Sequence, residues 1–140
     1  MDGTPLNIVH RDLDPNNILL SREGEVKITD FGLVRSDVQE HLTQTGVIKG
    51  KLHYMPPEAI LGEKFDHRSD IFALGVVLYE AVTGVKPFAD TVQFRIMDKI
   101  RHGEYDPPEK IAPRLPRRFA TSSSAPWRTS ATIVFRTRGR

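Results

Sequence analysis

Three oxygen-bearing side chains near the start of the chain have the types that phosphoryl transfer requires. Asn17 lies five residues after Asp12, and Asp30 follows Asn17 by 13 residues. In this chemistry positioning and charge neutralisation do most of the catalysis. Asp12 would accept the proton of an incoming hydroxyl, while Asn17 and Asp30 are hard oxygen donors that suit Mg²⁺. Each also has a structural alternative: Asp12 caps a turn, Asn17 forms an Asx-turn and Asp30 begins the loop after a strand.

Short apolar runs surround these residues and predict strands. The runs 18–21 and 26–29 are separated by four charged and glycine residues, which is typical of a β-hairpin. The run 6–9 predicts a further short strand just before Asp12. From residue 30 to residue 57 no period of 2 or 3.6 persists, so this segment is predicted to be a long irregular loop of the kind that carries function.

Two helices are predicted after this loop. Residues 70–84 are apolar on nearly every face, with Asp70 as an acidic N-cap and Gly84 as the terminal glycine. A helix of this composition belongs in the middle of a core. Apolar residues recur every four positions over residues 92–103, which predicts an amphipathic surface helix.

Three motifs occur in a fixed order along the chain: His10-Arg11-Asp12-Leu13-Asp14-Pro15-Asn16-Asn17, Asp30-Phe31-Gly32 and Tyr54-Met55-Pro56-Pro57-Glu58. With them the chain resembles the C-terminal lobe of a protein kinase, most like the bacterial serine/threonine group. The resemblance covers about residues 6–119. It implies an α+β fold, mainly α, in which a protein-kinase-like C-lobe carries short β-hairpins and the N-lobe is absent. Residues 1–119 are therefore expected to be a partial protein kinase domain.

The resemblance also implies an activity. A serine/threonine protein kinase transfers the γ-phosphate of Mg-ATP to Ser or Thr hydroxyls of protein substrates, with ATP and Mg²⁺ as cofactors. Asp12 then becomes the catalytic base, and Asn17 and Asp30 become the residues that bind the metal ions and through them the nucleotide. Without a glycine-rich loop and a strand lysine, we expect this isolated chain to be inactive. The alternative is a non-catalytic protein-interaction module or a pseudokinase-like remnant.

Arg11, next to the predicted base, marks kinases whose loop is ordered by phosphorylation, because a guanidinium pairs bidentately with a phosphothreonine. Thr43 and Thr45 are the candidate phosphorylation sites in that loop; the alternative is a polar, solvated loop. The remaining matches to the family are expected to be structural: His10, Phe31, Gly32, Glu58 and Asp70. Of these, Asp70 would accept backbone hydrogen bonds from the loop around Asp12 and Arg11.

Two departures from the family pattern lie beside the predicted base. Most serine/threonine kinases have Lys where this chain has Asp14, and Thr after the glycine where it has Lys51. One cation is lost and another is gained. We therefore expect Lys51 to reach into the site, pair with Asp14 and act as a substitute catalytic cation. Independent drift of the two positions is the alternative.

Charge divides the chain into two kinds of sequence. Residues 1–109 contain 12 Lys and Arg against 18 Asp and Glu, whereas residues 110–140 contain eight Lys and Arg and no acid. The pI near 9.0 is thus a property of the tail, and it does not indicate nucleic-acid binding by the whole chain. Residues 120–140 form a basic Ser/Thr/Arg-rich tail that we expect to be frameshifted or disordered.

The remaining features narrow the class of protein. The chain has 140 residues and no cysteine, which excludes a disulfide scaffold. No apolar run approaches the roughly 20 residues of a membrane-spanning helix, and no leader is visible, so the expected location is cytoplasmic. The expected partners are a protein substrate and a kinase N-lobe or another protein, with no nucleic acid and no membrane.

Overall fold

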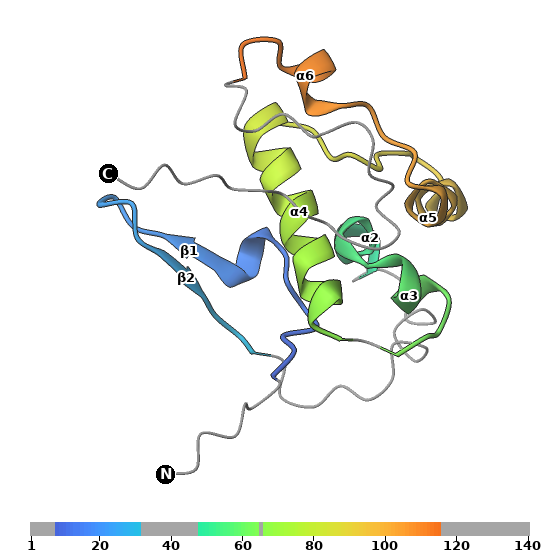
Figure 1. Cartoon of the computed structure of the whole chain (residues 1–140), viewed down its shortest axis with the longest axis horizontal. Coiled ribbons are helices and arrows are strands. Elements are labelled where there is room, and N and C mark those ends of the chain that lie inside the picture. Colours follow the sequence, from blue (N-terminus) through green and yellow to red (C-terminus); the bar gives the residue numbers. More distant parts are fainter. Residues whose placement is uncertain (1–7, 32–47, 65, 116–140) are drawn as a thin grey trace.

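The computed structural model describes residues 8–31, 48–64 and 66–115. The predictions for Gly32, Thr43, Thr45 and the 120–140 tail lie outside these residues. Within them the fold is mainly helical with one small sheet (Figure 1). The elements, in chain order, are η1 (Pro15–Asn17), β1 (Ile18–Leu20), β2 (Val26–Ile28), α2 (Ile48–Lys51), η2 (Leu52–Tyr54), α3 (Pro57–Ile60), α4 (His67–Thr83), α5 (Gln93–His102) and α6 (Pro108–Ile111).

The predicted hairpin is confirmed. β1 and β2 pair antiparallel, with Ile18 opposite Ile28 and Leu20 opposite Val26. The strand predicted over 6–9 is wrong for its described part, because residues 8 and 9 are irregular. The physical reason lies in the next two residues, whose backbone N–H groups donate to a helix carboxylate and not to a neighbouring strand.

The central helix α4 begins four residues earlier than predicted. Its N-cap is Asp66, whose side chain accepts a hydrogen bond from the backbone N–H of Arg68 at 2.8 Å, so the assignment of Asp70 as N-cap is wrong. Asp70 lies in the first turn, where its carboxylate faces the backbone of His10 and Arg11. The predicted end is confirmed, since Gly84 has φ 75°, a left-handed conformation that glycine adopts without a steric penalty.

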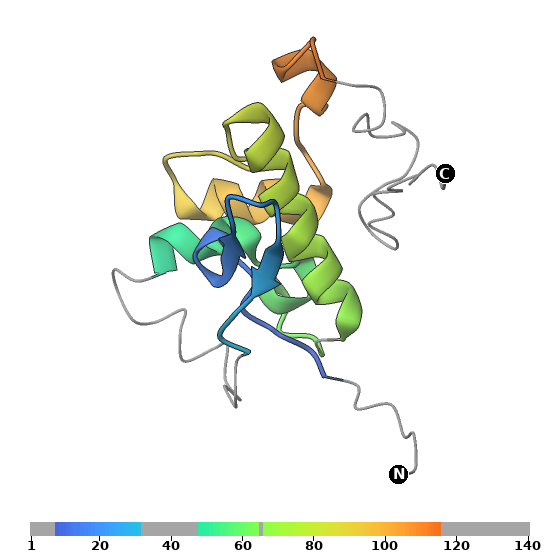
Figure 2. The ribbon, with the colours of Figure 1, turned by 90° about the vertical axis from the view of Figure 1, so that its left-hand side faces the viewer.

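The core lies on the side of α4 that faces η2 and α5, while the hairpin lies on its other side (Figures 1 and 2). Phe72 and Val76 of α4 pack there with Phe88, whose ring is parallel to that of Phe72 at 6.0 Å between centroids. The cluster also contains Leu52, Tyr54, Ile96 and Ile100. This explains the predicted amphipathic helix, which is α5 and buries its two isoleucines.

Two sequence predictions are corrected by this packing. The apolar helix is not covered on every side, because Ile71 is 42% exposed and Leu74 is 36% exposed. The segment 30–57 is not irregular throughout, since α2 and η2 form within it and η2 packs against α4. Across the described ranges, no helix is long and apolar enough to cross a membrane.

Candidate active site

The segment before η1 is held by one carboxylate of α4. Asp70 accepts the backbone N–H of His10 at 2.7 Å with one oxygen and that of Arg11 at 2.9 Å with the other. Arg11 has φ 65°, the left-handed region that non-glycine residues rarely occupy and that costs free energy to hold. The two hydrogen bonds from Asp70 therefore fix a strained turn immediately before Asp12.

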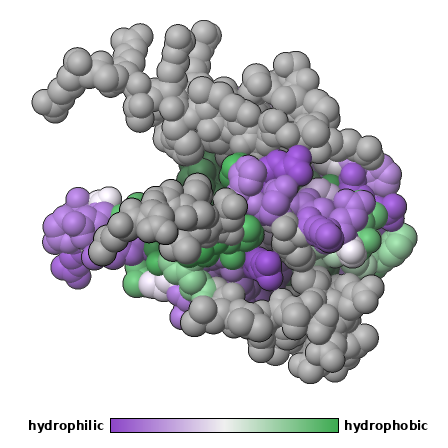
Figure 3. All heavy atoms as spheres, turned by 60° about the horizontal axis from the view of Figure 1, so that its bottom comes forward, coloured by the Kyte–Doolittle hydropathy of each residue, from purple (hydrophilic) through white to green (hydrophobic). Residues whose placement is uncertain are grey.

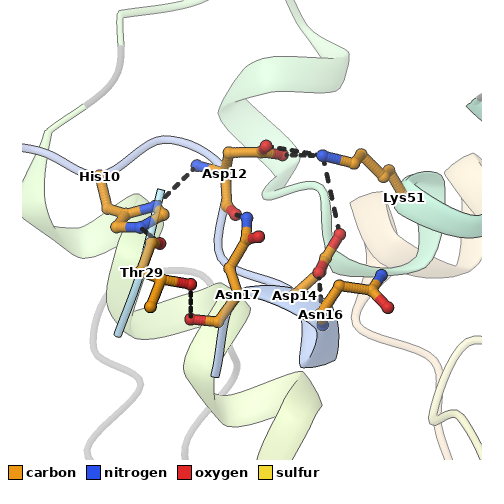
Figure 4. Close-up of polar contacts among 7 residues, drawn as sticks. All are labelled: His10, Asp12, Asp14, Asn16, Asn17, Thr29 and Lys51. Atoms are coloured by element: carbon orange, nitrogen blue, oxygen red, sulfur yellow. Dashed lines mark hydrogen bonds and ion pairs between the residues drawn. The ribbon is translucent and has the colours of Figure 1, made fainter. Parts of the chain in front are cut away.

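The buried ring of His10 connects this turn to the hairpin (Figure 4). Its Nδ1 accepts the backbone N–H of Asp12 at 3.3 Å, and its Nε2 lies 2.9 Å from the carbonyl oxygen of Thr29. Both contacts are satisfied when the proton is on Nε2, since Nδ1 must then accept. The ring of Phe31 lies against His10 at 4.8 Å between centroids. His10 and Phe31 thus join the two sequence motifs that carry Asp12 and Asp30.

Asn17 is buried at the end of η1 and has a fixed orientation. Its side-chain Nδ2 donates to the carbonyl oxygen of Asp12 at 2.7 Å, so the amide oxygen Oδ1 is the atom left to bind a cation. The backbone N–H of Thr29 donates to the carbonyl oxygen of Asn17 at 2.9 Å. This contact brings the residue before Asp30 against Asn17.

Asp30 is, after Arg11, the second non-glycine residue of the described ranges with a left-handed backbone, at φ 55°. Its exposed side chain and the Asn17 amide supply two hard oxygen donors from neighbouring backbone segments. Mg²⁺ takes one or two such side chains and completes its octahedron with water and phosphate oxygens. The part of the chain that the structure describes contains no group of three or more His, Cys, Asp or Glu suited to a metal. Two hard oxygen donors with the other coordination positions open fit a Mg²⁺ ion that keeps water or brings other oxygen ligands of its own.

Lys51 reaches the site from the end of α2, 39 residues after Asp12 (Figure 4). Its Nζ donates to both carboxylate oxygens of Asp12, at 2.7 and 2.6 Å. The same Nζ lies 3.7 Å from Oδ2 of Asp14. The expected pairing with Asp14 is thus the longer contact, and the shorter one is with the predicted base itself.

Two other predicted residues lie at the edge of this arrangement. Glu58, on α3, accepts the hydroxyl of Ser69 at 2.5 Å, which ties α3 to the first turn of α4. The side chain of Arg11 is exposed and makes no ion pair with any residue of the ranges 8–31, 48–64 and 66–115.

A second polar cluster beside the site was not identified from the sequence as a unit. The hydroxyl of Tyr54 donates to Glu80 of α4, and the Nζ of Lys86 lies 5.4 Å from the centre of the Tyr54 ring. Burial and then the Glu80 hydrogen bond raise the pKa of Tyr54 above its ordinary value. Burial, followed by the positive charge of Lys86, lowers the pKa of His53, whose buried Nδ1 has no hydrogen-bond partner among the described residues. No local sequence pattern joins these residues, because the helix brings Glu80 to Tyr54 across 26 positions.

The raised pKa of Tyr54 predicts a stability change in alkali. A raised pKa means that the neutral phenol stabilises the fold, fully below the unfolded value of about 10 and progressively less as the pH rises through the folded value. We expect Tyr54→Phe to lower the free energy of unfolding at pH 8 by about 1–2 kcal/mol, through loss of the Glu80 hydrogen bond. This deficit should shrink above pH 10 in urea denaturation of the full chain. A deficit of constant size from pH 8 to pH 11 would contradict the assignment.

Comparison with known proteins identifies the family. The protein kinase domain matches residues 5–126. The chain belongs to the protein kinase family. This confirms the resemblance that the three motifs indicate, and it places Asp12, Asn17 and Asp30 within a kinase domain.

Relatives of this kinase chain come from several bacteria. It is 46% identical over 114 residues to the tyrosine-protein kinase MasK of Myxococcus xanthus, covering 81% of this chain and 18% of MasK. It is 42% identical over 109 residues to the serine/threonine-protein kinase PknA of Mycobacterium tuberculosis, covering 78% of this chain and 25% of PknA. A probable serine/threonine-protein kinase of Clostridium perfringens is 40% identical over 109 residues, covering 78% of this chain and 16% of that protein. The kinase chain thus spans a quarter or less of the length of these relatives.

Proposed function

We propose that this chain is the C-lobe part of a kinase that transfers the γ-phosphate of Mg-ATP to a protein hydroxyl. The observation that carries the proposal is the fixed geometry around Asp12. Its main chain is held by His10 and Asn17, and its carboxylate lies at the surface beside Lys51. A half-exposed carboxylate on a rigid loop is what a base for an incoming hydroxyl requires.

Asn17 and Asp30 would hold Mg²⁺ in this proposal, with the ATP phosphates completing the coordination. When bound, ATP would supply the phosphoryl group, and Mg²⁺ would neutralise part of the charge on the phosphates. The chain's own residues do three things: Asp12 accepts the hydroxyl proton, Asn17 and Asp30 orient the nucleotide, and Lys51 supplies a cation beside the acceptor.

The proposed acceptor is a Ser or Thr hydroxyl. Most of the named relatives are serine/threonine-protein kinases, which supports this choice, whereas MasK is named a tyrosine-protein kinase. Asp14 replaces the lysine that normally supports Ser/Thr specificity, so the acceptor must be tested directly. Arg11, whose exposed guanidinium pairs with no carboxylate of the described ranges, is proposed to pair with a phosphate on Thr43 or Thr45. The boundary at residue 119 and the character of the 120–140 tail also stay predictions.

We further propose that the hairpin binds a kinase N-lobe or another protein, supplied by a separate segment or chain. Apolar side chains gather on one face of the molecule beside a hydrophilic group (Figure 3). In the hairpin, Leu19, Leu20 and Val26 are each more than half exposed. Apolar side chains clustered in this way at the surface mark contact sites with other proteins. The same observation supports the second candidate function, a non-catalytic interaction module, if no phosphoryl transfer is found.

The test is a chimaera of MasK in which the 114 aligned residues of this chain replace the MasK segment that they match. We expect the purified chimaera to transfer ³²P from Mg-ATP to Ser or Thr peptides, and the isolated 140-residue chain to transfer none. Matched peptides with Ser, Thr or Tyr as the acceptor determine the specificity. Label on Tyr alone would correct the acceptor, and a folded chimaera without label on any peptide would favour the interaction module.

A further inference from the structure

Asp14 is an unusual neighbour for a catalytic carboxylate, because it is charged and almost completely buried. Its side chain is 4% exposed, whereas that of Asp12 is 44% exposed. One Asp14 oxygen accepts the backbone N–H of Asn16 at 2.8 Å and caps η1. The other oxygen, Oδ2, faces Lys51. A buried carboxylate needs such compensation, since burial without partners is costly.

The ion pair with Asp12 alone would hold the Lys51 side chain in place only weakly. Both side chains are nearly half exposed, and ion pairs of this kind contribute little stability because water screens them and a long lysine loses rotamer freedom. Asp14 is buried on the other side of the same ammonium, so water screens its electrostatic attraction to Lys51 much less. Lys51 is thus shared by one accessible and one inaccessible carboxylate.

The proposed reaction requires this arrangement to change. Both oxygens of Asp12 accept from Lys51, so the acceptor hydroxyl has to share this carboxylate with the ammonium even though each oxygen keeps a second lone pair. We expect the ammonium to move off at least one of the two oxygens when the hydroxyl binds. Besides the two oxygens of Asp12, the carboxylate oxygen within ion-pair distance of this ammonium in the described ranges is Asp14 Oδ2, at 3.7 Å.

We propose that Asp14 is a positioning residue that takes over the Lys51 ammonium when Asp12 binds the acceptor hydroxyl. Asp14 then keeps the Lys51 ammonium at the site while Asp12 becomes available to the hydroxyl. The effects of Asp14 and Lys51 on the reaction are therefore coupled. This role rests on the proposed kinase function of the site. Holding the Lys51 ammonium is a role of Asp14 in addition to its cap on η1.

The test removes Asp12 and follows the ammonium in the full 140-residue chain. Lysine ammonium groups give ¹H–¹⁵N signals when hydrogen bonding slows their exchange, and a coupling across the bond identifies the accepting carboxylate. The native chain should show Lys51 coupled to Asp12. In Asp12→Ala the coupling should move to Asp14, and in Asp12→Ala/Asp14→Asn the Lys51 signal should be lost. Asn at position 14 keeps an oxygen for the Asn16 N–H, so the cap on η1 is preserved.

The exposed pair of Lys110 and Asp106, 2.6 Å apart, is the matched control, because no second carboxylate contacts that lysine in the described ranges. Asp106→Ala should abolish the Lys110 signal at once. If Asp12→Ala abolishes the Lys51 signal in the same way, the proposal is wrong. Asp12→Ala/Asp14→Glu should retain the signal, because a carboxylate is restored.

The ammonium measurement uses no nucleotide, so it stands or falls independently of phosphoryl transfer. In the MasK chimaera, Asp14→Asn should lower kcat while leaving KM for the peptide unchanged, as expected for a residue that acts after binding. An unchanged kcat would overturn the catalytic part of the proposal. A chimaera inactive with the native sequence would instead refute the proposed function, while the transfer of Lys51 to Asp14 remained measurable.

Discussion

Replacing Asp12 by Asn is expected to lower kcat of the MasK chimaera by about 10²- to 10⁴-fold, the usual contribution of a positioned general base. The amide has nearly the same shape but cannot accept the hydroxyl proton at neutral pH. The groups that position the loop are unchanged, because His10 and Asn17 contact the main chain of residue 12 and not its carboxylate. KM for ATP should therefore stay close to that of the unmodified chimaera. Steady-state transfer of ³²P to the preferred peptide measures both constants.

Two controls make this prediction specific. Asp106→Asn removes an exposed carboxylate that is likewise paired with a lysine at 2.6 Å, but lies outside the site, and should leave kcat unchanged. A thermal melt should show that Asp12→Asn remains folded, since exposed ion pairs contribute at most about 1 kcal/mol. A loss of less than tenfold in a folded variant would remove Asp12 from the role of base.

The local sequence predicts the elements whose signals are also local. The hairpin follows from two apolar runs around a charged turn, and the end of α4 follows from Gly84. The start of α4 could not be predicted in this way, because Asp66 and Asp70 are both suitable caps by type. What decides between them is tertiary: Asp70 is occupied by the backbone of His10 and Arg11, 60 and 59 residues away. The same long-range contacts explain why residues 8 and 9 do not form a strand.

The sequence predicts which residues form the candidate site better than it predicts which of their atoms are in contact. The motifs predict that Asp12, Asn17 and Asp30 belong to one site. In the structure Asn17 hydrogen-bonds to the backbone of Asp12. The charge exchange between positions 14 and 51 predicts that Lys51 enters the site. It does not predict that the ammonium lies closer to Asp12 than to Asp14, because burial of Asp14 is a property of the fold. The pairing of Tyr54 with Glu80 has no local signal for the same reason.

Replacing Asp70 by Ala is expected to lower the free energy of unfolding of the full chain by about 2–4 kcal/mol, because two hydrogen bonds to a charged acceptor are lost. The loss should be concentrated in the loop before Asp12. Arg11 occupies a left-handed conformation that is retained only where its surroundings impose it. Without the carboxylate, the amides of His10 and Arg11 should lose their protection from hydrogen exchange. Urea denaturation and amide exchange of the 140-residue chain measure the two effects.

Asp66→Asn, one turn earlier in the same region, is the control that separates loop anchoring from helix capping. Asn caps a helix as well as Asp does, so this variant should retain nearly all of the stability and the protection of both amides. Asp70→Asn should fall between the two, since its amide offers one accepting oxygen where the carboxylate offers two. Equal losses in Asp70→Ala and Asp66→Asn would assign Asp70 to the charge balance of the α4 N-terminus. The strained turn before Asp12 would then need a different anchor, and the fixed base on which the proposed kinase function depends would have lost its physical cause.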